Sequence, residues 1–230
     1  MKILITAGGT SEPIDDVRKI TNRSTGKLGL AIGERLLREY PDKLEKLYYL
    51  HGETADYPRG PQVEPVRIGG TVDLKERLTE ILTKDSIDAV IHSMAVSDYM
   101  VDKVTTVEAI KTGVESAEIT GNKISSSIDD LAIILKRTPK IIGIIKELSP
   151  RTKLVGFKLL SNVPHEELIA VAKGLMEKNR CDFVLANDLK EIGGGMHKGY
   201  LVHRDGRVDS METKEEIAEM IARRVMEQEA

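Results

Sequence analysis

The sequence predicts an α/β protein with three layers, in which helices cover both faces of a mainly parallel sheet. Short apolar runs typical of buried strands alternate with segments whose apolar residues recur at helical spacing, and turn residues separate the two kinds of segment. Such alternation favours parallel strands joined by crossover helices. The 230 residues are enough for a single domain, residues 1–230, with a substantial core.

The first half of the chain supplies this alternation most clearly. Residues 2–6 form an apolar run that enters a glycine turn, Ala7–Thr10, and a long loop leads to a helical pattern that begins at Lys27. Pro41 limits this helix. The spacing then predicts strands over 47–50 and 63–68, a helix over 71–82 and a strand over 89–92.

The second half is less regular at its start. Residues 99–122 have few strong apolar periods, so we expect a protruding flap of about 99–130. Thr138 and Pro139 predict a helix start, with Thr138 as the N-cap. A further βαβ unit is expected over 153–157, 166–178 and 183–186, then a hairpin around Asp205-Gly206 and a last helix with a capping box, Thr213 to Glu216.

Composition excludes several classes of protein. A net charge of −3 argues against a broad nucleic-acid-binding face. No apolar run approaches the roughly 20 residues that cross a membrane, and the strand at residues 2–5 leaves no room for a signal peptide. The single cysteine, Cys181, fits a reducing compartment. We therefore expect a cytoplasmic protein.

The most informative stretch runs from Thr6 to Gly29. Gly8 permits a close approach of the backbone, while Ser24 and Gly26 place amide and hydroxyl groups at the positive end of the next helix, an arrangement that suits phosphate oxygens. The spacing matches neither the Walker A loop nor the dinucleotide-binding glycine motif. Alone, the stretch predicts only a capped helix that can bind phosphate.

As a whole, this stretch resembles the motif of the phosphopantothenoylcysteine synthetases, Thr-Ala-Gly-Gly-Thr-x-Glu-Pro-Ile-Asp-x-Val-Arg-x-Ile-Thr-Asn-x-Ser-Ser-Gly-Lys-x-Gly. Three more blocks follow in the order of that family: residues 93–99, residues 123–126, and the strand ends at 156–159 with 186–188. The resemblance covers nearly the whole chain. It corresponds to the synthetase half of the common bifunctional bacterial protein.

The resemblance implies a Rossmann-like fold, a dimerisation flap and a ligase of coenzyme A biosynthesis. In that family, 4′-phosphopantothenate attacks the α-phosphate of CTP, or of ATP in eukaryotic relatives, and releases pyrophosphate. The amine of L-cysteine then displaces CMP from the acyl-nucleotidate. The implied cofactors are the nucleotide and Mg²⁺, and the implied partners are the two small substrates and a second copy of the chain. We expect no nucleic acid or membrane as a partner.

The resemblance also assigns roles to individual residues. Lys123 and Asn22 are the expected catalytic residues, and Arg18, Asn22 and Ala95 are expected to bind the acid substrate. We expect Arg18 and Asn22 to approach it from one subunit and Lys123 from the other. Asp98 is the candidate Mg²⁺ ligand. The expected nucleotide-binding residues are Gly8, Ser24, Gly26, Gly29, Met94, Asp98, Lys123, Lys136, Thr138, Pro139, Phe157, Lys178 and Asn187.

The chain departs from the family at three places. Ser125 and Ser126 stand where relatives often have lysines, which leaves the flap less positive. Gly174 replaces a second phosphate-binding lysine, and whether Lys173 substitutes for it is open. Met94 replaces an alanine and is expected to narrow the pocket near the base.

Two other functions fit parts of the sequence. Ser86, Tyr99 and Lys103 mimic the catalytic set of short-chain dehydrogenases, although a strand separates Ser86 from Tyr99 and the glycine motif is missing. A non-enzymatic nucleotide-binding regulator on the same fold is the second alternative. The five histidines have no metal-ligand spacing, and the loop 193–195 matches no motif.

Overall fold

The computed structural model describes residues 1–113, 119 and 121–227. Its centre is an eight-stranded sheet in the order β14-β13-β10-β9-β6-β1-β4-β5. Six neighbouring strands are parallel, whereas β13 and β14 are antiparallel additions at one edge. The strands of this sheet are β1 (Lys2–Ala7), β4 (Lys46–Gly52), β5 (Val63–Ile68), β6 (Ala89–His92), β9 (Lys153–Leu160), β10 (Phe183–Asp188), β13 (Gly199–His203) and β14 (Val208–Met211).

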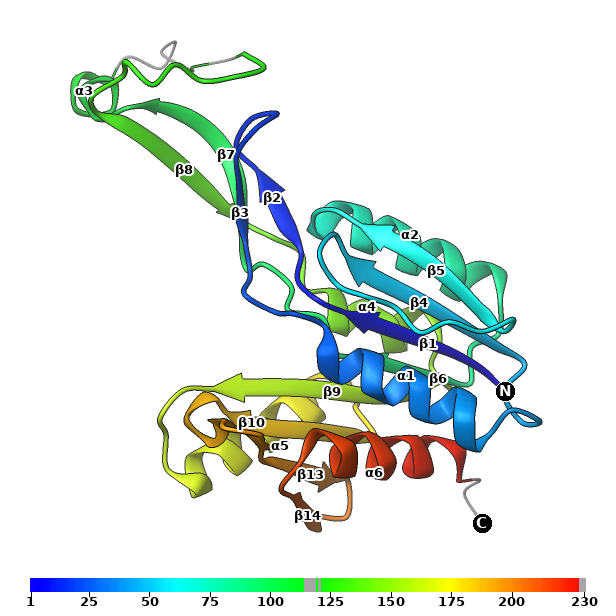
Figure 1. Ribbon diagram of the computed structural model, residues 1–230. Coiled ribbons are helices and arrows are strands. Elements are labelled where there is room, and N and C mark those ends of the chain that lie inside the picture. The colour runs from blue at the N-terminus through cyan, green and yellow to red at the C-terminus, as the bar shows by residue number, and fades with distance from the viewer. Residues whose placement is uncertain (114–118, 120, 228–230) are drawn as a thin grey trace.

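Helices cover both faces of this sheet, which confirms the predicted fold class (Figure 1). One face carries α1 (Lys27–Glu39) and α6 (Lys214–Met226), and the other carries α2 (Thr71–Lys84), α4 (Ile141–Leu148) and α5 (His165–Asn179). Alternate residues of the central strands serve the two faces. Ile3 and Ile5 pack in the cluster with α1 and α6, while Leu4 packs in the opposite cluster. The described helices include none long and apolar enough to cross a membrane.

Two hairpins project from the carboxyl edge of the sheet (Figure 1). The smaller consists of β2 (Ser11–Pro13) and β3 (Lys19–Thr21), and lies beside β7. The larger pairs β7 (Tyr99–Thr106) with β8 (Leu131–Arg137) and carries α3 (Val107–Thr112). The predicted flap therefore exists, but its base is a regular antiparallel hairpin rather than an irregular arm. Residues 114–118 and 120 of the expected flap lie outside the described residues.

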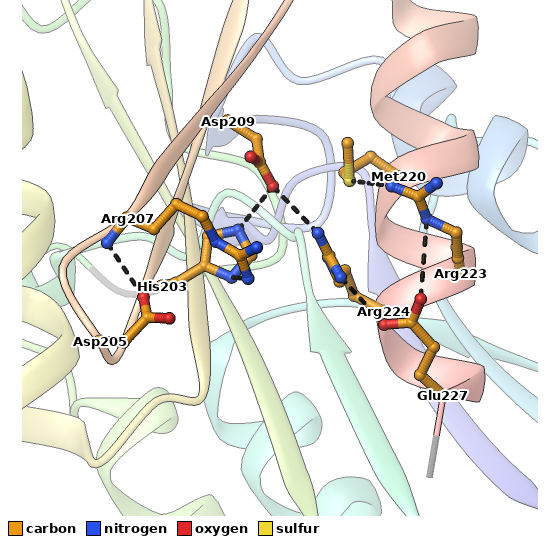
Figure 2. A network of polar contacts seen from close by, with 8 residues as sticks. All are labelled: His203, Asp205, Arg207, Asp209, Met220, Arg223, Arg224 and Glu227. Atoms are coloured by element: carbon orange, nitrogen blue, oxygen red, sulfur yellow. Dashed lines mark hydrogen bonds and ion pairs between the residues drawn. The ribbon is translucent and has the colours of Figure 1, made fainter. Parts of the chain in front are cut away.

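The C-terminal hairpin is attached to α6 by a polar network (Figure 2). Arg207 donates to Nδ1 of His203 at 3.1 Å, so Nε2 of the neutral ring carries the proton and donates to Asp209 at 2.8 Å. Arg224 of α6 also donates to Asp209, at 3.4 Å. The predicted turn at Asp205-Gly206 is confirmed, with Gly206 at φ 89°.

Two predicted helix caps differ in the structure. The residue before α4 is Lys140, not Thr138, whose hydroxyl instead donates to the carbonyl of Ser97. At α6, Thr213 accepts from the main-chain N–H of Glu216 as predicted, but the Glu216 carboxylate binds the N–H of Glu212.

Short elements complete the chain: η1 (Leu189–Glu191), β11 (Ile192–Gly193) and β12 (Met196–His197).

Candidate active site

The loops that follow β1 and β6 are joined beyond the ends of the strands. The N–H of Ala95 donates to Gly8 O at 2.8 Å, and the N–H of Thr10 donates to Ala95 O at 3.1 Å. Gly9 and Ala95 thus form a parallel bridge that extends the pairing of the two strands. The carboxyl ends of parallel strands are where α/β sheets bind ligands, so the joined loops form the floor of the candidate site.

Asn22 is fixed on this floor. Its Nδ2 group donates to Ala95 O at 3.1 Å and to Ser97 Oγ at 3.3 Å. A carbonyl can only accept, so the bond to Ala95 determines the orientation of the amide. The Oδ1 atom of Asn22 has no partner within the described part of the chain. Asn22 therefore holds the loop through its donors and offers an acceptor to a ligand.

Thr10 and Ser97 complete the polar floor, and the sequence reasoning did not identify them. Their hydroxyl groups are 2.9 Å apart, and Thr10 Oγ1 also accepts from the N–H of Ser97 at 2.9 Å. Both main-chain groups of Ala95 are engaged in the floor itself: its N–H donates to Gly8 O, and its oxygen accepts from both Thr10 and Asn22. The expected backbone contact of Ala95 with a substrate would therefore have to replace one of these bonds.

The glycines of the first loop serve close packing. Gly8 and Gly26 have φ of 84° and 73°, and a Cβ on either would lie 2.7–2.8 Å from Cβ of Ala55. A Cβ on Gly29 would lie 2.6 Å from Cβ of Ala7, so this glycine lets α1 pack directly on β1. These expected nucleotide-binding positions thus shape the loop, because no side chain would fit there beside Ala55 and Ala7.

Cationic groups are available beside this loop. Arg23 and Lys27 are exposed and flank the start of α1, and no ion pair of either occurs among residues 1–113, 119 and 121–227. Ser24 is half-buried between them. The first turn of α1 contains no acidic residue. The entrance to α1 therefore combines unpaired positive charge with the positive end of the helix dipole.

Asp98 and Lys136 lie at the base of the flap, where the chain passes between the sheet and β7–β8. Asp98 is exposed and forms an ion pair with Lys140, and Lys136 pairs with Asp102 at 3.0 Å. Thr138 donates its N–H to Asp98 O, which places Pro139 beside the same loop. No group of three or more potential metal ligands occurs in the described residues, so the part of the chain that the structure describes contains no preformed cage of protein ligands for Mg²⁺. A nucleotide-bound Mg²⁺ commonly takes one or two carboxylates and fills its other positions with phosphate oxygens and water, and Asp98 fits that arrangement.

Several predicted residues pack in the core or bond within the sheet rather than in this floor. Met94 is 6% exposed and packs within the core cluster of α2, α4 and α5, and its expected effect on a base pocket stays a prediction. Phe157 packs beside the cluster of α1 and α6. Asn187 is buried at the end of β10 and donates to Lys198 O at 2.7 Å.

Lys173 and Lys178 are on the second half of α5. Because α5 runs back from the end of β9 to the start of β10, its last turn lies at the opposite edge of the sheet from the joined loops. A cavity of about 470 Å³ at that edge is lined by Lys146, Lys173 and Arg204 among others. Asp182 pairs with both Lys146 and Arg204, at 2.8 and 3.1 Å. The structure therefore does not bring Lys178 together with the floor in one chain.

Arg18 binds the flap segment that carries Lys123 at the tip of the β2–β3 hairpin. Arg18 donates to the main-chain O of Ile124 at 2.8 Å, next to Lys123 in the chain. Arg18 is therefore held beside the Lys123 segment of its own chain, and whether the two residues serve one site from different subunits stays a prediction. Asn22 lies four residues from Arg18 along β3, which at about 3.3 Å per residue is about 13 Å. Tyr99 and Lys103 are on β7 rather than on a helix, so the dehydrogenase set is not formed.

Comparison with known proteins agrees with this geometry. Residues 1–228 match the family described as the DNA/pantothenate metabolism flavoprotein C-terminal domain. The chain belongs to this family. A solved member, the DNA/pantothenate metabolism flavoprotein from Streptococcus pneumoniae, is 38% identical with a TM-score of 0.86, and the match covers 98% of each chain.

Curated relatives of the family are longer than this chain. The coenzyme A biosynthesis bifunctional protein CoaBC of Thermococcus kodakarensis is 34% identical over 96% of this chain and 49% of the relative. That of Methanocaldococcus jannaschii is 31% identical over 97% and 50%. The chain spans about half the length of these relatives. A Cab2 variant solved with phosphopantothenate-cysteine shares the fold, with a TM-score of 0.73 at 18% identity over 98% of this chain and 85% of that one.

Proposed function

We propose that this chain catalyses the ligation of 4′-phosphopantothenate to L-cysteine with CTP. The observation that carries the proposal is the family match over residues 1–228, combined with a polar floor at the carboxyl edge that is built from the family's own motif residues. In the first step, a carboxylate oxygen attacks the α-phosphorus and pyrophosphate leaves. In the second, the cysteine nitrogen bonds to the acyl carbon, the C–O bond to CMP breaks and the amine loses a proton.

The residues of this chain suit a reaction that concentrates negative charge. Arg23, Lys27 and the first N–H groups of α1 are placed to bind phosphate oxygens, and Lys123 is an exposed ammonium on the flap. Asn22 Oδ1 is placed to accept from an N–H or O–H group of a bound substrate. Mg²⁺ would neutralise the triphosphate, with Asp98 as its protein ligand.

The working unit in this proposal is a dimer with composite sites. Lys123 lies between two flap residues that are bonded to the hairpin tip, Asn122 and Ile124, whereas Asn22 lies at the base of the hairpin, beyond β3. The flap also exposes apolar side chains that a partner would cover: Tyr99, Val107, Ile110 and Leu135. A two-fold partner would bring its own Lys123 over the floor that carries Asn22.

The test is a product assay with defined components. The protein is incubated with phosphopantothenate, Mg²⁺ and either CTP or ATP, with and without cysteine, while pyrophosphate and product mass are followed. We expect pyrophosphate release that depends on phosphopantothenate, product only when cysteine is added, and a higher kcat/KM with CTP than with ATP. Equal values for both nucleotides would contradict the CTP assignment. A protein that binds nucleotide but releases no pyrophosphate would be a regulator rather than a ligase.

A further inference from the structure

A buried carboxylate at the tip of the β2–β3 hairpin connects two segments that are far apart in the sequence. The Asp15 side chain is 1% exposed. Its Oδ1 accepts from the N–H groups of Val17 and Arg18, at 2.9 and 2.7 Å, and so closes the hairpin turn. Its Oδ2 accepts from Nε of Arg18 and from the N–H of Ile124, both at 3.0 Å. Oδ1 thus serves the turn, while Oδ2 binds both the Arg18 guanidinium and the flap.

Two further bonds strengthen this junction. Nη2 of Arg18 donates to Ile124 O at 2.8 Å, so the N–H and the C=O of one flap residue bind the same hairpin tip. The N–H of Asp16 donates to Asn122 O at 3.1 Å. The main chain is therefore held on both sides of Lys123, at Asn122 and at Ile124. The Arg18 guanidinium and the main-chain donors hold the pKa of Asp15 well below its usual range, so the carboxylate is ionised at neutral pH.

We propose that Asp15 is a positioning residue for the ligase reaction: through Arg18 and Ile124 it places the Lys123 segment where the ammonium can reach the acyl group. This inference rests on the proposed function. The new element is that the β2–β3 hairpin of the same chain positions Lys123, whether Lys123 then acts at the site of its own subunit or at that of the partner. Fixing the main chain matters because a long lysine side chain otherwise spreads over many positions.

The substitution Asp15→Asn distinguishes the roles of the two carboxylate oxygens, because it can keep the hydrogen bonds of one oxygen while removing those of the other. An amide has one acceptor oxygen, so with that oxygen on the turn side it still accepts from Val17 and Arg18. It then presents an NH₂ group to the N–H of Ile124 and to the Arg18 guanidinium, and none of these donors can bond to another donor. The matched control is Asp16→Asn, the same chemical change on an adjacent exposed residue whose contact with Asn122 is made by its main chain.

The catalytic test measures the rates of the two half-reactions separately: formation of the acyl-nucleotidate and its reaction with cysteine. In Asp15→Asn we expect pyrophosphate release in a single turnover to stay within about twofold of wild type, while conversion of the trapped acyl-nucleotidate to product slows at least tenfold. Asp16→Asn should match wild type in both. Added to Lys123→Gln, Asp15→Asn should cause no further loss, because both act on one interaction. Losses that multiply, or an equal loss in both half-reactions, would overturn the positioning role.

A structural readout keeps this test independent of the proposed function. Hydrogen exchange at the Ile124 amide should be at least tenfold faster in Asp15→Asn than in Asp16→Asn. Unchanged exchange would refute the junction itself. Faster exchange in a protein whose wild type forms no product would retain the junction and refute the proposed function and its catalytic extension.

Discussion

His92 gives the structure a predicted dependence on pH. It is the last residue of β6 and lies directly beneath the loop that carries Ala95 and Ser97. The residue is 7% exposed, and its Nδ1 lies 2.8 Å from the hydroxyl of Thr6. That hydroxyl accepts from the N–H of Met94, which leaves its proton for Nδ1. Burial lowers the pKa of His92 from 6.5 to about 4, so the ring is neutral in the folded protein at neutral pH.

The sign and size of the effect follow from linkage. The unfolded chain takes up a proton at His92 near pH 6.5, whereas the folded chain takes it up only near pH 4. The contribution to stability is therefore complete above about pH 6.5 and is lost as the pH falls to about 4. A difference of about 2.5 pH units corresponds to about 3 kcal/mol, of which about 2 kcal/mol is lost between pH 7 and pH 5.

The assay is urea unfolding of wild type and His92→Asn at pH 7 and pH 5. Asparagine keeps an acceptor for Thr6 but does not titrate. We expect wild type to lose about 2 kcal/mol more than the variant between the two values of pH. His165→Asn, which removes an exposed histidine, should retain the wild-type dependence. If His92→Asn showed the same loss as wild type, His92 would not be a neutral buried group and the reasoning would be refuted.

Three further predictions concern the cap of α2 and the composite site. The buried Glu12 carboxylate accepts from the N–H and the hydroxyl of Thr71, so Glu12→Ala should lower the free energy of unfolding by about 2 kcal/mol. Glu12→Gln keeps an acceptor oxygen and should lose less than half as much free energy of unfolding as Glu12→Ala in the same denaturation assay. Equal losses in the two variants would mean that the charge of Glu12, not its hydrogen bonds, stabilises the helix. Lys123→Gln should still form acyl-nucleotidate by mass spectrometry but release little product, and normal turnover would contradict its role in the cysteine step. Mixing Asn22→Ala with Lys123→Gln should restore activity to about a quarter of wild type as subunits exchange, because half of the dimers are mixed and each has one intact site. Heterodimers without activity would place both residues in one subunit's site.

Local sequence predicted the elements whose signals lie within a few residues. The strands of the parallel sheet, the five helices that cover it and the Asp205-Gly206 turn all follow from apolar spacing and turn chemistry. Strand β8 was missed because its partner, β7, begins 32 residues earlier, as Tyr99 and Leu131 show. Threonine is a common N-cap residue, but the hydroxyl of Thr138 donates instead to the main-chain carbonyl of Ser97, which lies in a distant loop.

The residues of the candidate site were largely identified by the long motif, but their contacts were not. The sequence by itself determined the fold class, the family and the presence of Asn22, Arg18 and Lys123 in that motif and its flap. Only the tertiary structure decided that the donors of Asn22 hold a loop, that Met94 belongs to the core and that Arg18 holds the main chain beside Lys123. The physical reason is that periodicity reports which face of an element is buried. A hydrogen bond between residues about 100 positions apart depends on how loops from different strands meet, and no local pattern records that meeting.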